Sequence, residues 1–340
     1  MQRFTCRCGQ PVFFDNAQCT ACGARLGFDS EALVMRALQP DDGQWVSEDG
    51  ATWLLCDNAI QHGVCNWLLH ADQESPLCRA CQFNRTVPNL EQPANSERWA
   101  RLEQAKKRLF YTLLQLGLPL ATLAESPQRG LAFDFVEDQR SGQGFCESFA
   151  HTGYAAGIVT INLLEADDVA REEQREFLRE DYRTVLGHLR HESGHYFWHL
   201  LQPDADIAGA FKALFGDEFE DYAAALEAHY TQGPPQDWSS RFISAYASAH
   251  PSEDWAESWG HYLHIYDALE TAAAHGLVPQ GPEEMTVQER ITRWRDLSVT
   301  LNELNRSIGL SDAYPFVLNT AVELKLTFVD RVISLFQTLR

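Results

Sequence analysis

Apolar residues recur every three to four positions over most of the chain beyond residue 95, which is the spacing of a buried helix face. The first such stretch follows Ser96, a residue type that caps helix N-termini. A later stretch opens at Pro251, with Glu253 and Asp254 in the first turn, where the helix dipole favours negative charge. We therefore expect helices from Ser96 through Leu116, at about 172–201, twice within 204–232, briefly at 238–249, from Pro251 to before Gly276, and at about 285–305 and 317–338.

Two stretches instead carry the β-branched character of strands. They are residues 131–136 and 154–162, and the second contains the run Ile158-Val159-Thr160-Ile161. A β-branched run of this kind suits an ordinary core strand, and it suits equally a strand whose edge accepts an extended peptide. The pattern predicts an α+β fold, mainly helical, with a small sheet near the start of the large domain.

The first 90 residues have a different composition, since they contain no lysine and eight of the chain's nine cysteines. Pro88 and Pro93, with two asparagines, mark residues 86–95 as a linker. Clustered cysteines in a chain with no apparent leader favour metal over disulfides. Two sets of four cysteines predict two closed structural zinc sites: Cys6, Cys8, Cys19 and Cys22 form the first cysteine set, and Cys56, Cys65, Cys78 and Cys81 form the second.

The charge of the chain restricts its partners, because 48 acidic residues against 27 basic ones give a net charge of −21. Such a charge opposes binding to nucleic acid, although it is equally typical of an ordinary soluble protein. No apolar run is long enough to span a bilayer. We therefore expect a cytoplasmic protein with no membrane partner and no nucleic-acid partner, and the sequence leaves its oligomeric state open.

Residues 191–195 read His-Glu-Ser-Gly-His, within a predicted helix. Residues four apart share a helix face, so His191 and His195 can reach one zinc ion, and Glu192 can take a proton from water beside it. The alternative is a helix with surface histidines. The apolar flanks, from Leu189 to Trp198, indicate a buried helix instead, where two histidines and a glutamate need a structural reason.

A catalytic zinc site needs a third protein ligand and an open position. The acidic helix that starts at Pro251 is the best source, and its Glu253 and Glu257 lie four residues apart on one face. One of the two can bind the metal while the other orients a ligand histidine.

The pattern Tyr246-x6-Glu253-x3-Glu257 resembles the anthrax lethal factor type of gluzincin, a zinc peptidase with a glutamate as third ligand. The resemblance implies that Glu253 binds zinc, that Glu257 supports a histidine, and that Tyr246 faces the substrate carbonyl. Zinc peptidases of this group hold substrate as an added strand, which points to Gly157, Ile158 and Val159 as an edge that binds peptide.

Over nearly its whole length the chain also resembles bacterial zinc-binding metallopeptidases with an N-terminal zinc ribbon. This resemblance implies a zinc-ribbon domain at 1–90, a gluzincin-type peptidase domain at 96–340, and a peptide or protein substrate. The cofactors would be one catalytic and two structural zinc ions. A peptidase fold that is inactive and recruits partners through its ribbons remains the alternative. The motifs that carry the resemblance are Cys6-Arg-Cys8-Gly, Ile161-Asn-x3-Ala-Asp-Asp168, residues 182–196, His250-Pro-Ser-Glu-Asp-Trp-Ala-Glu257 and Asp312-Ala-Tyr-Pro-Phe316.

Overall fold

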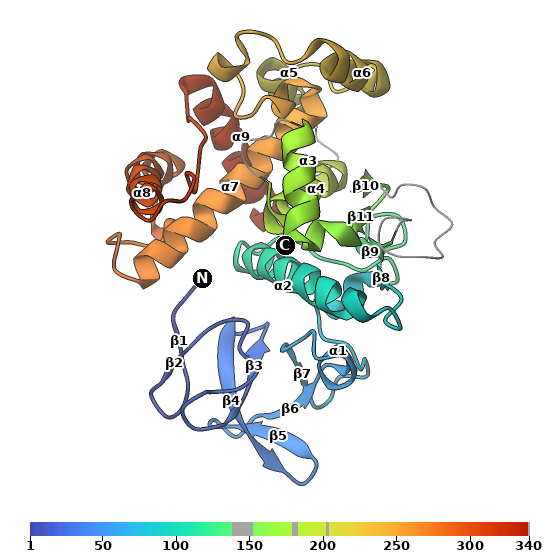
Figure 1. Ribbon diagram of the computed structural model, residues 1–340, viewed down its shortest axis with the longest axis vertical. Helices are drawn as coiled ribbons and strands as arrows, with labels where there is room; N and C mark the ends of the chain where they lie inside the picture. The colour runs from blue at the N-terminus through green and yellow to red at the C-terminus, as the bar shows by residue number, and fades with distance from the viewer. Residues whose placement is uncertain (138–151, 179–182, 202–203, 339–340) are drawn as a thin grey trace. The chain divides into compact units, whose positions relative to one another are not determined.

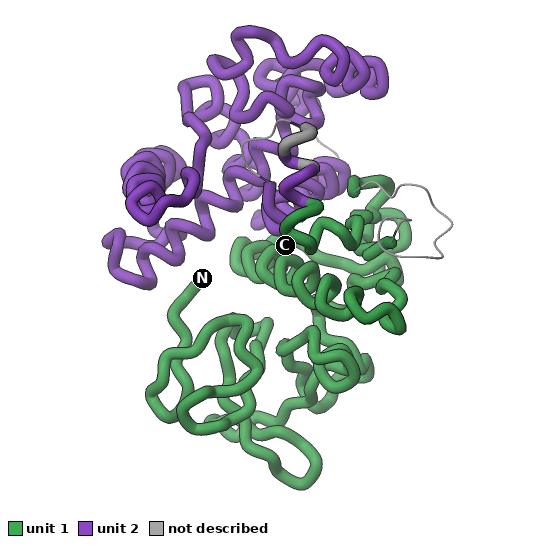
Figure 2. The backbone as a smooth tube through the Cα atoms, in the orientation of Figure 1, with its two compact units in different colours: residues 1–170 green, residues 171–340 purple. Residues whose placement is uncertain are grey.

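The structure is a computed structural model that describes residues 1–137, 152–178, 183–201 and 204–338. The chain divides into two compact units, Met1–Ala170 and Arg171–Arg340, which Figure 2 colours separately. The ninth cysteine, Cys146, lies outside the described residues. No described helix combines the length and hydropathy needed to cross a bilayer.

The first cysteine-rich part of unit 1 is built on antiparallel strands rather than on loops alone. A small hairpin precedes a five-stranded sheet in which each strand pairs with the next along the chain, and this sheet has a core of Leu38, Trp53 and Leu68. Figure 1 draws these strands in blue. The hairpin is β1 (Phe4–Thr5) and β2 (Pro11–Val12), the sheet is β3 (Arg25–Asp29), β4 (Val34–Asp41), β5 (Gln44–Ser47), β6 (Thr52–Leu55) and β7 (Leu68–His70), and helix α1 (Asp57–Gln61) follows β6.

The long helix α2 (Pro93–Gln115) holds this part of unit 1 together. It begins three residues before the expected cap at Ser96, because Pro93 occupies a first-turn position that needs no backbone N–H. Its Lys107 Nζ donates to Val64 O at 3.2 Å, beside the second cysteine set, while Tyr111 stacks edge-on against Phe14 near the first set.

A second sheet in unit 1 has the strand order β10-β11-β9-β8. The predicted strand at 131–136 is confirmed, but the expected strand at 154–162 is two strands joined by a tight turn. The turn is possible because Ala156 and Gly157 have φ values of +47° and +87°, the left-handed region that glycine adopts at little cost. The strands are β8 (Asn84–Thr86), β9 (Ala132–Val136), β10 (Gly153–Ala155) and β11 (Ile158–Asn162).

The expectation that Gly157, Ile158 and Val159 form an open edge is therefore wrong. Ile158 and Val159 lie on β11, which pairs with β9 on one side and with β10 on the other, and Gly157 lies in the turn. The chain folds back on itself at that turn, so its own backbone occupies the hydrogen-bonding edge that a substrate strand would need.

Unit 2 is helical. The expected single helix over 172–201 is interrupted, since residues 183–184 are not helical. The expected short helix at 238–249 is present only as two isolated 3₁₀ turns, Trp238–Ser240 and Tyr246–Ser248. The helices are α3 (Asp168–Leu178, which starts at the end of unit 1), α4 (Val185–Leu201), α5 (Ala205–Phe215), α6 (Tyr222–Gln232), α7 (Pro251–Ala274), α8 (Val287–Ser307) and α9 (Thr320–Thr338).

The orange helix α7 in Figure 1 is the centre of unit 2, because it packs against α4, α8 and α9. The His250 ring caps its N-terminus by accepting a hydrogen bond from Ser252 N. Trp255 and Trp259 are fully buried on its apolar face. This packing brings the first turns of α7 against the middle of α4, where the His-Glu-Ser-Gly-His sequence lies.

Candidate metal centre

Two helices of unit 2 supply three converging polar side chains. His191 and His195 project from α4 and Glu253 from α7, and one donor atom of each lies within 4.8 Å of the others. Glu253 Oε2 is 2.9 Å from His191 Nε2 and 3.6 Å from His195 Nε2. The structure thus brings together the three residues that the sequence and the resemblance select.

The close approach of α4 and α7 depends on Ser193 and Gly194, which lie between Glu192 and His195. A Cβ atom on Gly194 would lie 3.0 Å from Ala256 Cα and 3.1 Å from Trp259 Cβ, so only glycine fits without displacement. Ser193 Oγ accepts a hydrogen bond from Trp259 Nε1 at 3.0 Å. These contacts were not anticipated from the sequence, because nothing in the motif itself requires serine and glycine there.

Glu257 lies behind His191 rather than beside the three converging atoms. Its Oε1 is 2.8 Å from His191 Nδ1, and its Oε2 accepts a 2.6 Å hydrogen bond from Ser244 Oγ. Burial raises the pKa of Glu257, but the bond and charge of His191 outweigh it and lower the pKa to about 2. An ionised Glu257 accepts the Nδ1 proton of His191, which leaves Nε2 as the ring nitrogen that can bind a metal.

This arrangement fits a cation. Burial lowers the pKa of His191, but the hydrogen bonds and charges of Glu253 and Glu257 raise it well above its usual value, so positive charge between His191 and Glu253 is favoured. A metal ion at His191 Nε2 would supply that charge in place of a proton. Glu253 is 1% exposed, and its Oε2 has no hydrogen-bond partner among the described residues. Two imidazole nitrogens and one carboxylate oxygen are the donor set of catalytic zinc sites.

Glu192 lies on the same helix as the histidines and is also buried. Its Oε1 is 3.2 Å from His188 Nε2. Burial raises the pKa of Glu192, but the His188 hydrogen bond and the nearby His191 and His195 charges lower it below its usual value. The carboxylate is therefore available to accept a proton. His188, one helical turn before Glu192 on α4, is the partner of this group.

Two tyrosines complete the surroundings. The Tyr246 ring centroid lies 6.0 Å from that of His191, as expected for a residue near the centre. Burial, followed by the charge of Glu253, raises the pKa of Tyr246, so its hydroxyl keeps its proton. The Tyr222 hydroxyl on α6 donates to Glu253 Oε1 at 2.8 Å. No spacing rule could have indicated Tyr222, since α6 carries no recognisable motif.

Both cysteine sets of unit 1 converge as the sequence predicts, with the four sulfur atoms of each set within 4.8 Å of one another. Cys6 Sγ is 3.7 Å from Cys22 Sγ, and Cys65 Sγ is 3.6 Å from Cys78 Sγ. A disulfide requires about 2.0 Å. Four thiolates about 2.3 Å from one tetrahedral zinc lie about 3.8 Å apart, which matches these separations.

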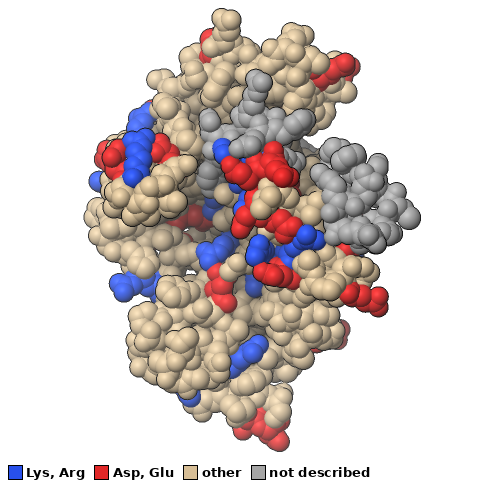
Figure 3. Space-filling model, in the orientation of Figure 1, with Lys and Arg blue, Asp and Glu red and all other residues tan. Residues whose placement is uncertain are grey.

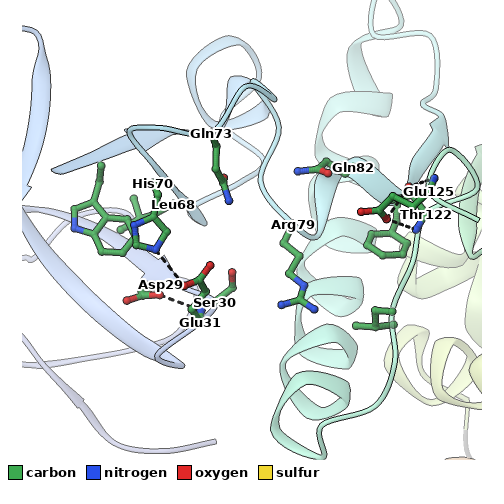
Figure 4. Close-up of a pocket in the computed structure, with 13 residues that line it drawn as sticks. Asp29, Ser30, Glu31, Leu68, His70, Gln73, Arg79, Gln82, Thr122 and Glu125 are labelled. Atoms are coloured by element: carbon green, nitrogen blue, oxygen red, sulfur yellow. Dashed lines mark hydrogen bonds and ion pairs between the residues drawn. The ribbon is translucent and has the colours of Figure 1, made fainter. Parts of the chain in front are cut away.

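Unit 1 also contains a cavity of about 260 Å³, shown in Figure 4. Asp29, Glu31 and His70 lie on one wall, and Arg79 and Gln82 lie on the other. The Asp29 carboxylate already accepts hydrogen bonds from two backbone N–H groups and a neighbouring arginine. This carboxylate therefore stabilises the local turn and strand.

Comparison with known proteins agrees with this geometry. Residues 95–332 match the family described as "Putative zinc-binding metallo-peptidase", and residues 3–92 match a zinc-ribbon family. The chain belongs to this metallopeptidase family. Its two matched regions confirm the α+β organisation of a zinc ribbon followed by a helical peptidase region. Zinc binding is thereby supported for both regions.

Similar proteins occur in mycobacteria. The chain is 40% identical to "Uncharacterized protein Rv2568c" of Mycobacterium tuberculosis over 98% of this chain and 96% of the relative. It has the same identity and coverage with "Uncharacterized protein Mb2598c" of Mycobacterium bovis. No solved structure matches the chain.

Proposed function

We propose that the protein is a zinc-dependent peptidase that hydrolyses peptide bonds. The observation that carries the proposal is the convergence of His191, His195 and Glu253 beside a buried, ionised Glu192. The first three residues would hold the metal, in the arrangement of a gluzincin. A metal site needed only for stability would have no use for a carboxylate that is held beside it as a base.

The chemistry divides between the metal and the protein. When bound, zinc supplies a Lewis acid that polarises a carbonyl and makes water acidic near neutral pH. Glu192 accepts a proton from the attacking water and later donates it to the leaving amine. Tyr246, whose raised pKa keeps it protonated, donates a hydrogen bond to the developing oxyanion. Glu257 keeps His191 in one tautomer.

The cysteine sets would each hold one structural zinc ion, which brings the total to three. Sites closed by four thiolates do no chemistry, and they stabilise small domains whose cores are limited. We infer that residues 1–90 contact proteins rather than nucleic acid. Residues 1–90 contain ten acidic residues against six arginines and no lysine, a balance that opposes phosphate binding. On the face drawn in Figure 3, the described Lys and Arg side chains lie in separate small groups and form no single basic surface.

The proposal is tested by a peptide-library cleavage profile of the full chain and of Glu192→Gln. Wild type should cleave and the variant should retain its zinc while losing about 10²-fold to 10⁴-fold of the rate, because it lacks the proton acceptor. Glu289→Gln is the matched control, since Glu289 is an exposed carboxylate in the capping box of α8. It should cleave at the wild-type rate.

Activity that survives in Glu192→Gln would refute the assigned mechanism. Wild-type protein that binds library peptides but cleaves none would favour the inactive adaptor instead. Tyr246→Phe distinguishes the oxyanion role, because loss of one donor should cost about 10²-fold to 10³-fold in kcat.

A further inference from the structure

Helix α6 contacts the rest of unit 2 through polar and aromatic side chains. None of its residues is fully buried, so an apolar face contributes little to its attachment. Two of its side chains instead point toward the metal centre. The Tyr222 hydroxyl reaches Glu253, and the His229 ring contacts the ring of Tyr246 with centroids 6.1 Å apart.

The two carboxylate oxygens of Glu253 have different neighbours. Oε1 accepts the Tyr222 hydrogen bond at 2.8 Å, while Oε2 faces His191 Nε2 at 2.9 Å. The last side-chain torsion of glutamate has a broad energy minimum, so packing alone fixes it poorly. A directional hydrogen bond to one oxygen fixes the direction of the other.

The hydrogen bond between Tyr222 and Glu253 matters more for Glu253 than for Tyr222. Tyr222 is 44% exposed and could hydrogen-bond to water instead, whereas Glu253 is 1% exposed and depends on protein donors. Tyr222 is also supported from the α7 side, because its ring packs edge-on against His250 with centroids 5.1 Å apart. His250 caps α7, and its Nε2 lies 3.2 Å from Glu220 O just before α6.

We propose that Tyr222 is a positioning residue for the metal centre, which holds Glu253 with Oε2 directed at the metal and thereby strengthens zinc binding. The same bond fastens α6 beside the centre. The inference rests on the proposed role of Glu253 as a metal ligand, and it does not require that the protein cleave peptides.

The test compares Tyr222→Phe with Tyr262→Phe in the full chain. Tyr262→Phe is matched because the Tyr262 hydroxyl donates to another carboxylate, Asp330, at 2.5 Å and away from the metal centre. Zinc affinity is measured by competition with a chromogenic chelator. Glu253→Ala identifies the zinc that belongs to this centre, as opposed to zinc in the cysteine sets.

Tyr222→Phe should weaken zinc binding at this centre by about tenfold or more, the usual effect of losing a hydrogen bond to a ligand. Tyr262→Phe should leave zinc affinity unchanged. The amides of α6 should exchange faster in Tyr222→Phe than in wild type.

Three results would overturn the inference: zinc affinity unchanged in Tyr222→Phe, an equal loss in Tyr262→Phe, or no zinc lost in Glu253→Ala. Faster exchange in α6 with unchanged zinc affinity would mean that Tyr222 only fastens the helix. If Tyr222→Phe weakens zinc binding while wild type cleaves no peptide, the positioning role stands and the proposed peptidase activity fails.

Discussion

The geometry at His191 predicts different consequences for the two glutamates of α7. Glu253 Oε2 lies 2.9 Å from His191 Nε2, and Glu257 Oε1 lies 2.8 Å from His191 Nδ1 on the other side of the ring. Under the proposed assignment, removing charge from Glu253 removes a metal ligand. Under the same assignment, removing charge from Glu257 would only weaken the orientation and basicity of His191.

The magnitude for Glu257→Gln follows from its single contact with His191. Loss of a hydrogen-bonding partner of a ligand histidine typically reduces metal affinity by about 10-fold to 100-fold, or about 1.4–2.7 kcal/mol. Glu253→Gln should cost more, because it exchanges a charged ligand for a neutral amide. The assay is zinc competition with a chelator on the full chain, in which the zinc lost in Glu253→Ala identifies the zinc of this centre.

Ser244→Ala provides a graded control. Ser244 Oγ donates to Glu257 Oε2 at 2.6 Å, so its loss should weaken zinc binding less than Glu257→Gln does. If Glu257→Gln reduced zinc affinity as much as Glu253→Gln or more, the roles of the two glutamates would have to be exchanged.

Three further results are expected. Lys325→Met should destabilise unit 2 by about 3–5 kcal/mol in chemical denaturation, since Lys325 Nζ pairs with fully buried Asp254 at 2.5 Å. Removal of the exposed Lys212 should cost under about 1 kcal/mol, and equal losses would contradict the reasoning. Gly194→Ala should cost about 1–3 kcal/mol and weaken zinc binding, because its Cβ would press on Ala256 at 3.0 Å; a neutral result would show that α4 and α7 can separate freely. Zinc removal by a strong chelator should abolish amide protection in β3–β7 while α8 and α9 keep theirs, and uniform protection would show that the cysteine sets do not stabilise their sheet.

Much of the chemistry could be predicted locally. His191 and His195 share a face because the helix period places residues four apart on one side. The first cysteine set could be predicted for a similar reason. Gly9 and Gly23 have positive φ values, which allow the tight turns that direct the thiolates toward one another. These features depend only on neighbours in sequence.

The strand prediction at residues 157–159 failed for a nonlocal reason. The β-branched run correctly indicated a strand, but its position in the sheet depends on which segments pair with it. The turn at Ala156 and Gly157 folds the preceding residues back as β10, and β9 takes the other side. A local pattern contains no information about this pairing.

The sequence by itself determined which residues can bind metal, because ligand spacing on a helix and in a short turn between cysteines is a local property of the backbone. It also indicated that Glu253 and Glu257 share a helix face. Only the tertiary structure divided these two glutamates between the opposite nitrogens of His191, and only the tertiary structure brought Tyr222 from α6 to Glu253. Those contacts join segments that are far apart in the chain, so they exist only once α4, α6 and α7 have packed together.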